Sequence, residues 1–176
     1  GPDHPDTATS LNNLGALLAD MGNYAGARPY FERAMAINEK VLGPDHPKSA
    51  LNLNNLGALL QTMGDYEAAR PYFERALAID PTIGEAYANL AGIAWAFDHD
   101  LDKTADLLEQ ATRLDPWNLE ILGFARDFAR AIGDLQTSVK LGQLILLRDP
   151  LCTGCRGRKL KPRALKRSRT RSSRTA

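Results

Sequence analysis

The sequence predicts an all-α fold built from stacked helical hairpins. When the chain is shifted by 42 residues, 27 of the 38 positions in residues 1–38 are identical to those in residues 43–80. Self-similarity on this scale is typical of a solenoid, in which each repeat packs only on its neighbours. In the second copy, apolar residues recur at helical spacing on both sides of a Gly64-Asp65 turn, which indicates two amphipathic helices per repeat.

The second repeat, residues 46–81, shows the pattern most clearly. Gly64 suits the left-handed residue that often ends a helix, and Pro81 cannot continue one. The predicted buried positions are Leu53, Leu56 and Leu60 in its first helix and Tyr66, Ala69, Phe73 and Ala76 in its second. The first repeat, residues 4–42, has the equivalent residues Leu11, Leu14, Leu18, Tyr24, Ala27, Phe31 and Ala34.

The linker that joins these two repeats contains Gly43, Asp45, His46 and Pro47. Gly43 is expected to end a helix, Asp45 to cap the next one and Pro47 to lie in its first turn. His46 and the equivalent His4 are interpreted as exposed turn residues. A metal site is not expected there, because no second ligand lies at a useful spacing.

The third and fourth repeats, residues 82–116 and 117–150, keep the pattern but diverge in sequence. The turn at residues 97–100 lacks glycine and carries one extra residue, and its acidic side chains are interpreted as helix caps. The expected core of the third repeat is Tyr87, Leu90, Ala91, Ala94, Ala105, Leu108 and Ala111. In the fourth repeat Gly142 stands where the second repeat has Phe73. This predicts thinner packing between its helices and the least stable hairpin of the array. Its other expected core residues are Leu122, Ala125, Ala129, Ser138 and Ile145.

The recurring motifs L-N-N-L-G and A-R-P-Y-F-E-R-A resemble the tetratricopeptide repeat (TPR), in particular the long-spaced form of kinesin light chains and many bacterial repeat proteins. The resemblance covers residues 1–150. It implies a right-handed superhelix of four hairpins whose first helices line a concave groove. It also implies a scaffold that binds an extended peptide or a partner protein and needs no cofactor.

The candidate ligand-binding residues lie on the first helices. Asn13, Asn55 and Asn89 occupy equivalent positions, each before a seam leucine. Asparagine is a mediocre helix former, so its recurrence favours a role over a chance surface residue. The resemblance implies that these amides contact the main chain of an extended ligand. The flanking groups would be Trp95 as an apolar anchor, and Glu85 and Glu120, which would favour basic ligand residues.

A carboxylate clamp of the kind found in chaperone-binding TPR proteins is not expected. The lysines and arginines that line such a clamp are absent, and the nearby residues are Thr9, Leu51 and Glu85. A ligand held by its C-terminal carboxylate is therefore not predicted.

The charge of the chain changes abruptly near its end. Residues 1–150 carry 21 acidic and 12 basic residues, a net charge of −9, whereas residues 151–176 carry 10 basic residues and no acidic one. This segment is expected to be disordered. It is interpreted as an arm for nucleic acid or another acidic surface, as a partner of the array's own acidic face, or as a non-native reading frame. The last is favoured, because a fifth repeat fails where the composition changes.

Other functional classes find little support in the sequence. Cys152 and Cys155 form a lone CxxC without a second metal-binding pair or a thioredoxin-like context. No nucleophile-histidine pattern and no glycine-rich phosphate loop occurs, so an enzyme is not expected.

No apolar run reaches the roughly 18 residues of a membrane span. A cytoplasmic location is expected from the array without disulfides. Gly1 falls inside a repeat linker, which predicts a piece of a longer chain. The rival hypotheses are a nucleic-acid-associated protein that uses residues 151–176, and a structural part of a larger signalling protein.

Overall fold

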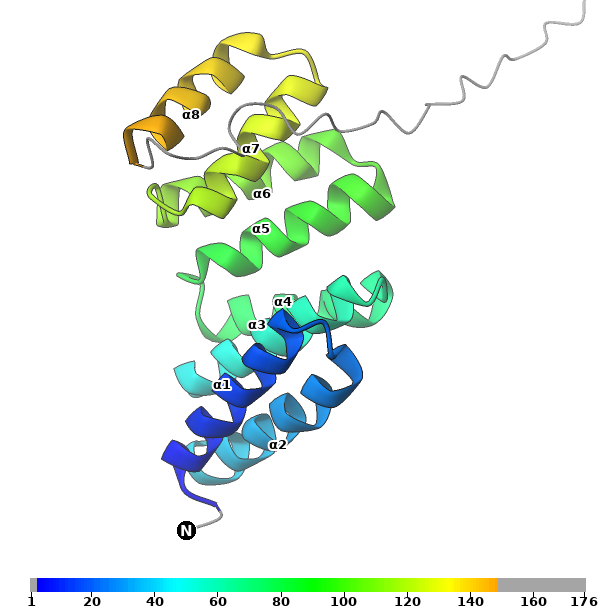
Figure 1. Cartoon of the computed structure of the whole chain (residues 1–176), viewed down its shortest axis with the longest axis vertical. Helices are drawn as coiled ribbons and strands as arrows, with labels where there is room; N and C mark the ends of the chain where they lie inside the picture. Colours follow the sequence, from blue (N-terminus) through cyan, green and yellow to red (C-terminus); the bar gives the residue numbers. More distant parts are fainter. Residues whose placement is uncertain (1–2, 149–176) are drawn as a thin grey trace, which may run out of the picture.

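A computed structural model describes residues 3–148 as four helical hairpins stacked in chain order (Figure 1). The predicted all-α fold is confirmed, since these residues contain no strand. The hairpins are α1 (Pro5–Asp20) with α2 (Tyr24–Leu42), α3 (Pro47–Thr62) with α4 (Tyr66–Ile79), α5 (Gly84–Ile93) with α6 (Leu101–Leu114), and α7 (Leu119–Ala131) with α8 (Leu135–Arg148). The predictions about the basic segment 151–176 and its two cysteines lie outside the described residues.

The turn inside the second hairpin has the predicted geometry. Gly64 ends the helix with φ +86°, a conformation that favours glycine. Asp65 follows it and caps α4, because its carboxylate accepts a hydrogen bond from the Ala68 backbone N–H at 3.1 Å.

The cap of α3 is a histidine. The residue before a proline is driven into an extended backbone, and His46, directly before Pro47, has φ −80° and ψ 141°. Its Nδ1 accepts a hydrogen bond from the Lys48 backbone N–H at 3.1 Å. The prediction that Asp45 caps this helix is therefore wrong, because the helix starts at the proline and the cap falls on the residue just before it.

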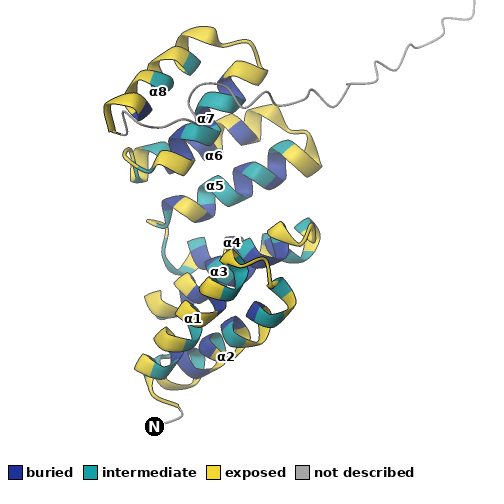
Figure 2. Cartoon of the chain, viewed as in Figure 1, coloured by how far each residue is buried: buried dark blue, intermediate teal, exposed yellow. Residues whose placement is uncertain are grey.

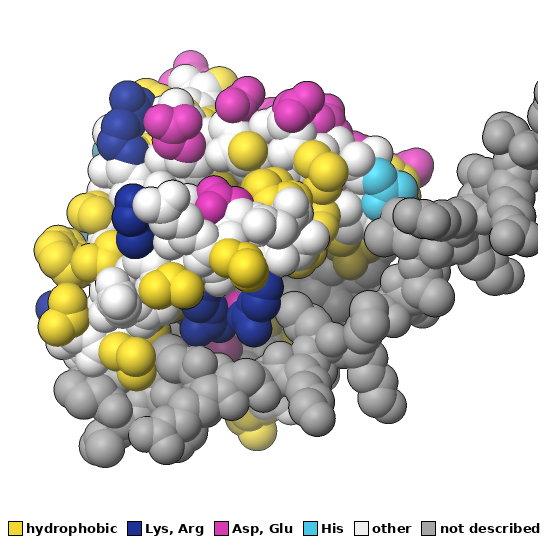
Figure 3. All heavy atoms as spheres, turned by 90° about the horizontal axis from the view of Figure 1, so that it is seen from above, with side chains coloured by type: hydrophobic (Ala, Val, Ile, Leu, Met, Phe, Trp, Pro, Cys, Tyr) yellow, Lys and Arg dark blue, Asp and Glu magenta, His cyan; other side chains and the backbone are white. Residues whose placement is uncertain are grey.

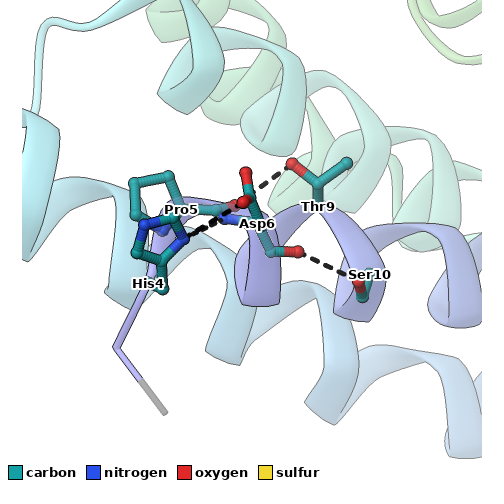
Figure 4. A network of polar contacts seen from close by, with 5 residues as sticks. All are labelled: His4, Pro5, Asp6, Thr9 and Ser10. Carbon is teal, nitrogen blue, oxygen red and sulfur yellow. Dashed lines mark hydrogen bonds and ion pairs between the residues drawn. The ribbon is translucent and has the colours of Figure 1, made fainter. Parts of the chain in front are cut away.

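The start of α1 has the same arrangement with further hydroxyl contacts (Figure 4). His4 Nδ1 accepts a hydrogen bond from the Asp6 backbone N–H at 3.2 Å. The Thr9 hydroxyl donates to the Pro5 carbonyl at 3.1 Å, and the Ser10 hydroxyl donates to the Asp6 carbonyl at 2.9 Å. His4 and His46 thus each cap the start of a helix by accepting a backbone hydrogen bond.

The third hairpin turns without glycine, as predicted. A π-helical turn, η1 (Ala94–Asp98), accommodates the extra residue, and His99 adopts the left-handed conformation with φ +58°. Residues of α6 therefore align with those of α4 at a shift of 35 positions, so Thr104 corresponds to Ala69. Thr104 is buried and Ala105 is exposed, so the prediction that Ala105 belongs to the core is wrong.

Inside each of the first two hairpins a phenylalanine on the second helix packs on a glycine of the first. A Cβ added at Gly57 would lie 2.8 Å from Phe73 Cε1, and one at Gly15 would lie 3.1 Å from the Phe31 ring. Phe73 is fully buried. The predicted core positions of these phenylalanines are therefore confirmed. Each ring fits because the glycine facing it has no side chain.

The fourth hairpin reverses this pairing of sizes. Gly142 stands on α8 where the second repeat has Phe73, and Arg126 stands on α7 where it has Gly57. The Arg126 stem covers the gap, since its Cδ lies 3.8 Å from a Cβ built at Gly142, and its guanidinium pairs with Asp127 at 2.9 Å. A separate apolar hollow of about 300 Å³ lies between α6, α7 and α8, and neither Gly142 nor Arg126 lines it. At Gly142 itself the Arg126 stem thus takes the place of the phenylalanine ring.

The two nearly identical first helices differ sharply in burial. Leu56 and Leu59 on α3 are 2% and 4% exposed, because they pack in one cluster with Ala27 and Phe31 of α2. Their equivalents on α1, Leu14 and Leu17, are 40% and 56% exposed. The prediction that Leu14 is buried is therefore wrong, since no hairpin precedes α1 in the described residues to cover it.

The other end of the stack also exposes apolar side chains. Figure 2 shows that most of α8 is exposed, and Leu135, Val139 and Leu147 are each more than half exposed. Viewed along the long axis from this end, hydrophobic side chains lie among charged ones on the surface (Figure 3). The described helices include none that combines the length and the hydropathy needed to cross a membrane.

Candidate binding groove

The first helices of three successive repeats share one surface cavity. α3, α5 and α7 together line a hollow of about 360 Å³. Its polar lining consists of Asn54, Asn55, Gln61, Asn89, Asn118, Glu85 and Glu120, and its apolar lining includes Ala58, Ala88, Ile121 and Phe124. Four of the six predicted ligand-binding residues therefore line this cavity, namely Asn55, Asn89, Glu85 and Glu120.

The asparagines of successive repeats are linked by hydrogen bonds. Asn55 Nδ2 donates to Asn12 Oδ1 at 3.0 Å, and Asn89 Nδ2 donates to Asn54 Oδ1 at 3.4 Å. The second asparagine of one repeat thus bonds to the first asparagine of the repeat before it. We call this row the asparagine ladder. Asn13 is exposed and does not line the cavity.

Gln61 is a groove residue that the sequence pattern did not single out. Its Nε2 donates to the Asn89 backbone carbonyl at 3.3 Å, which ties the end of α3 to α5. Its Oε1 is buried and accepts no hydrogen bond from any described residue. Buried acceptors are normally paired, so this oxygen is an exception among the described residues. The repeat alignment could have indicated Gln61, because its equivalent in the third repeat is Trp95. Each of the two side chains contacts the first helix of the following repeat.

Trp95 lies on the seam between the third and fourth repeats. Its ring stacks on Phe124, with centroids 5.4 Å apart and an interplanar angle of 26°, and meets Phe128 edge-on at 5.8 Å. Trp95 does not line the cavity, whereas Phe124 does. Phe124 occupies the position of Asn55 and Asn89, so the asparagine ladder gives way to an aromatic contact at this seam.

The two carboxylates lie on equivalent turns of neighbouring helices. Glu85 and Glu120 are exposed and fall in the first turns of α5 and α7. Neither carboxylate has a hydrogen bond or ion pair to another described residue. No lysine or arginine lines the cavity. The amino-terminal turns of α5 and α7 therefore place two negative charges at the groove, with no counterion from residues 3–148.

The acidic turn of the third repeat is occupied by structural contacts. Asp98 forms an ion pair with Arg70 of α4 at 2.7 Å. Asp100 caps α6 by accepting a hydrogen bond from the Lys103 backbone N–H at 3.0 Å, so the capping interpretation is confirmed for Asp100 and not for Asp98. Residues 3–148 contain no group of three or more acidic, histidine or cysteine side chains that could hold a metal ion.

Two family models, both described as tetratricopeptide repeat, match residues 6–82 and 53–118. Their ranges together span residues 6–118, well over half of the chain. The chain belongs to the tetratricopeptide repeat family. As a TPR protein it has the general architecture of a protein–protein interaction scaffold. Whether its repeats are of the kinesin-light-chain form stays a prediction.

Solved structures of MamA share this TPR fold. A MamA double mutant matches with a TM-score of 0.60 and 22% identity, covering 85% of this chain and 78% of that one. A fragment of MamA from Desulfovibrio magneticus RS-1 matches with a TM-score of 0.59 and 22% identity, covering 84% and 77%. At this identity the likeness concerns the fold alone.

Curated relatives match a shorter stretch. Clustered mitochondria protein homologs of Aspergillus clavatus and Aspergillus oryzae are 37% and 35% identical over 43 residues. That stretch is 24% of this chain and 3% of each relative. The match therefore spans about one repeat of much longer proteins.

Proposed function

We propose that this TPR array binds an extended peptide segment of a partner protein along the groove of α3, α5 and α7. The observation that supports it is the cavity that these three first helices share, with amide side chains on successive helices. An amide both donates and accepts hydrogen bonds, so it matches a peptide main chain of any sequence.

The spacing of the helices suits such a ligand. Packed helices lie about 8–10 Å apart, and an extended chain rises about 3.3 Å per residue, so one helix meets about every third peptide residue. Asn55 uses one N–H in its bond to Asn12. Its carbonyl oxygen and second N–H are the groups that would meet the peptide main chain.

The asparagine ladder provides a matched pair of variants. Asn55→Ala and Asn12→Ala remove the same hydrogen bond between repeats, but only Asn55 lines the cavity. Both variants should lose similar stability, about 0.5–1.5 kcal/mol. Only Asn55→Ala should weaken peptide binding, by about 1 kcal/mol or more, because a ligand group is left unpaired.

The experiment selects peptides from a phage-displayed library on the full chain and measures their affinity by titration calorimetry. Thermal unfolding of each variant gives the stability loss separately from the affinity. Equal affinity in wild type, Asn55→Ala and Asn89→Ala would overturn the proposal. So would an equal affinity loss in Asn12→Ala and Asn55→Ala, because the effect would then come from the hydrogen bond between repeats.

A further inference from the structure

Two carboxylates give the groove its charge. Glu85 and Glu120 both line the cavity, and neither forms an ion pair within residues 3–148. The amides beside them offer both donors and acceptors, because Asn54 and Asn118 use their oxygens whereas Asn55 and Asn89 each use one N–H. A ligand group that satisfies the two carboxylates has to donate hydrogen bonds and carry positive charge.

An aromatic face lies in the same cavity. Phe124 lines it beside Ile121, on the helix that also carries Glu120. Trp95 holds the Phe124 ring by stacking, with centroids 5.4 Å apart. A planar cation stacks well on such a ring, so the cavity combines flat apolar contact with anionic acceptors.

We propose that the groove selects peptides with an arginine, whose guanidinium enters the cavity between Glu85, Glu120 and Phe124. This inference rests on the proposed function and names the side chain that the groove recognises. Guanidinium carries five N–H donors in a planar fork, sheds water more readily than ammonium and stacks on aromatic rings. Lysine carries the same charge, but its ammonium group is not planar and lacks the parallel N–H donors of guanidinium. An acidic side chain would meet two like charges and, in the described part of the cavity lining, no lysine or arginine.

The probes are the blocked pentapeptide acetyl-Ala-Ala-Arg-Ala-Ala-amide and its versions with lysine or citrulline at the centre. Citrulline keeps the shape of arginine but has no charge. Binding is followed on the ¹⁵N-labelled full chain, using the side-chain amide signals of Asn55, Gln61 and Asn89. The arginine peptide should shift these signals and bind about tenfold more tightly than the citrulline peptide, with lysine between them.

Two variants test the carboxylates without changing their size. Glu85→Gln and Glu120→Gln should each weaken arginine-peptide binding by about two- to fivefold, the range for an exposed ion pair, and less at high salt. Glu74→Gln is the control, because Glu74 is exposed on α4 and does not line the cavity. It should leave the affinity unchanged.

The outcomes separate this inference from the proposed function. Equal binding of the arginine and citrulline peptides, with the groove signals shifted, would overturn the arginine preference and leave peptide binding in the groove intact. Binding that shifts only signals outside the groove would overturn the proposed site. If no probe binds while library-selected peptides do, the arginine preference is overturned and peptide binding stands.

Discussion

The substitution Gly57→Ala tests how the hairpins are packed. The new methyl group would lie 2.8 Å from Phe73 Cε1 and 3.0 Å from Cζ, closer than real Cβ contacts. The Phe73 ring has no space into which it can easily move, because it is fully buried in the main cluster. Alanine is otherwise the better helix residue, so two effects of opposite sign compete at this position.

The magnitudes decide the sign. Replacing glycine by alanine within a helix gains about 0.5–1 kcal/mol. Overpacking a well-filled core costs about 1–3 kcal/mol. Gly57→Ala should therefore lower the free energy of unfolding by about 1 kcal/mol. Gly142→Ala should raise it by about 0.5–1 kcal/mol, because its Cβ meets only Arg126 Cδ at 3.8 Å.

The assay is urea unfolding followed by circular dichroism, with the midpoint compared at constant slope. Gly123→Ala is a second control, because nothing lies within 4 Å of its Cβ. A rescue variant follows from the third repeat, which has Ala91 and Leu108 at the positions of Gly57 and Phe73. Adding Phe73→Leu to Gly57→Ala should cost less than the two single changes together. A Gly57→Ala protein as stable as Gly142→Ala would refute the reasoning.

The fourth hairpin should open first, because Gly142 stands where the second repeat has Phe73 and α8 is mostly exposed. Hydrogen exchange should show its amides as the least protected, and the prediction fails if α8 exchanges as slowly as α4. Acid should weaken the start of α8, because the backbone and side-chain hydrogen bonds of Thr137 lower the pKa of Asp134 below its usual value. This stabilisation is present above the unfolded pKa and is lost as the pH falls through the folded one. Asp134→Asn keeps a cap but cannot titrate, so its melting temperature should fall less than that of wild type between about pH 6 and about pH 3; equal falls would contradict this.

Much of the fold follows from local sequence signals. Helical spacing placed Phe31 and Phe73 in the core, and Gly64 marked a turn with positive φ, because each depends on one helix or one turn. Position in the array was harder to predict. Leu14 and Leu56 have the same local sequence, so their different burial depends on the neighbouring hairpin.

The groove was predicted less well than the fold, for a related reason. The pattern identified Asn55 and Asn89 but could not show that each amide reaches back to the first asparagine of the preceding repeat. Such bonds join residues 43 and 35 positions apart, beyond any helical period. Trp95 was predicted as an apolar anchor for the ligand, yet its ring stacks on Phe124 of the next repeat.

The paired leucines of α1 and α3 also bear on how the two copies can change through evolution. Leu59 is nearly fully buried and Leu17 is more than half exposed, although both belong to the same L-N-N-L-G-A-L-L stretch. In the described array a polar residue at Leu59 would bury an unpaired group at a cost of about 1–3 kcal/mol, whereas one at Leu17 would meet water. Packing within residues 3–148 therefore constrains the side chain at Leu59 and places no such constraint on Leu17. A hairpin stacked in front of α1 would extend the same constraint to Leu17, because it would cover that helix as α2 covers α3.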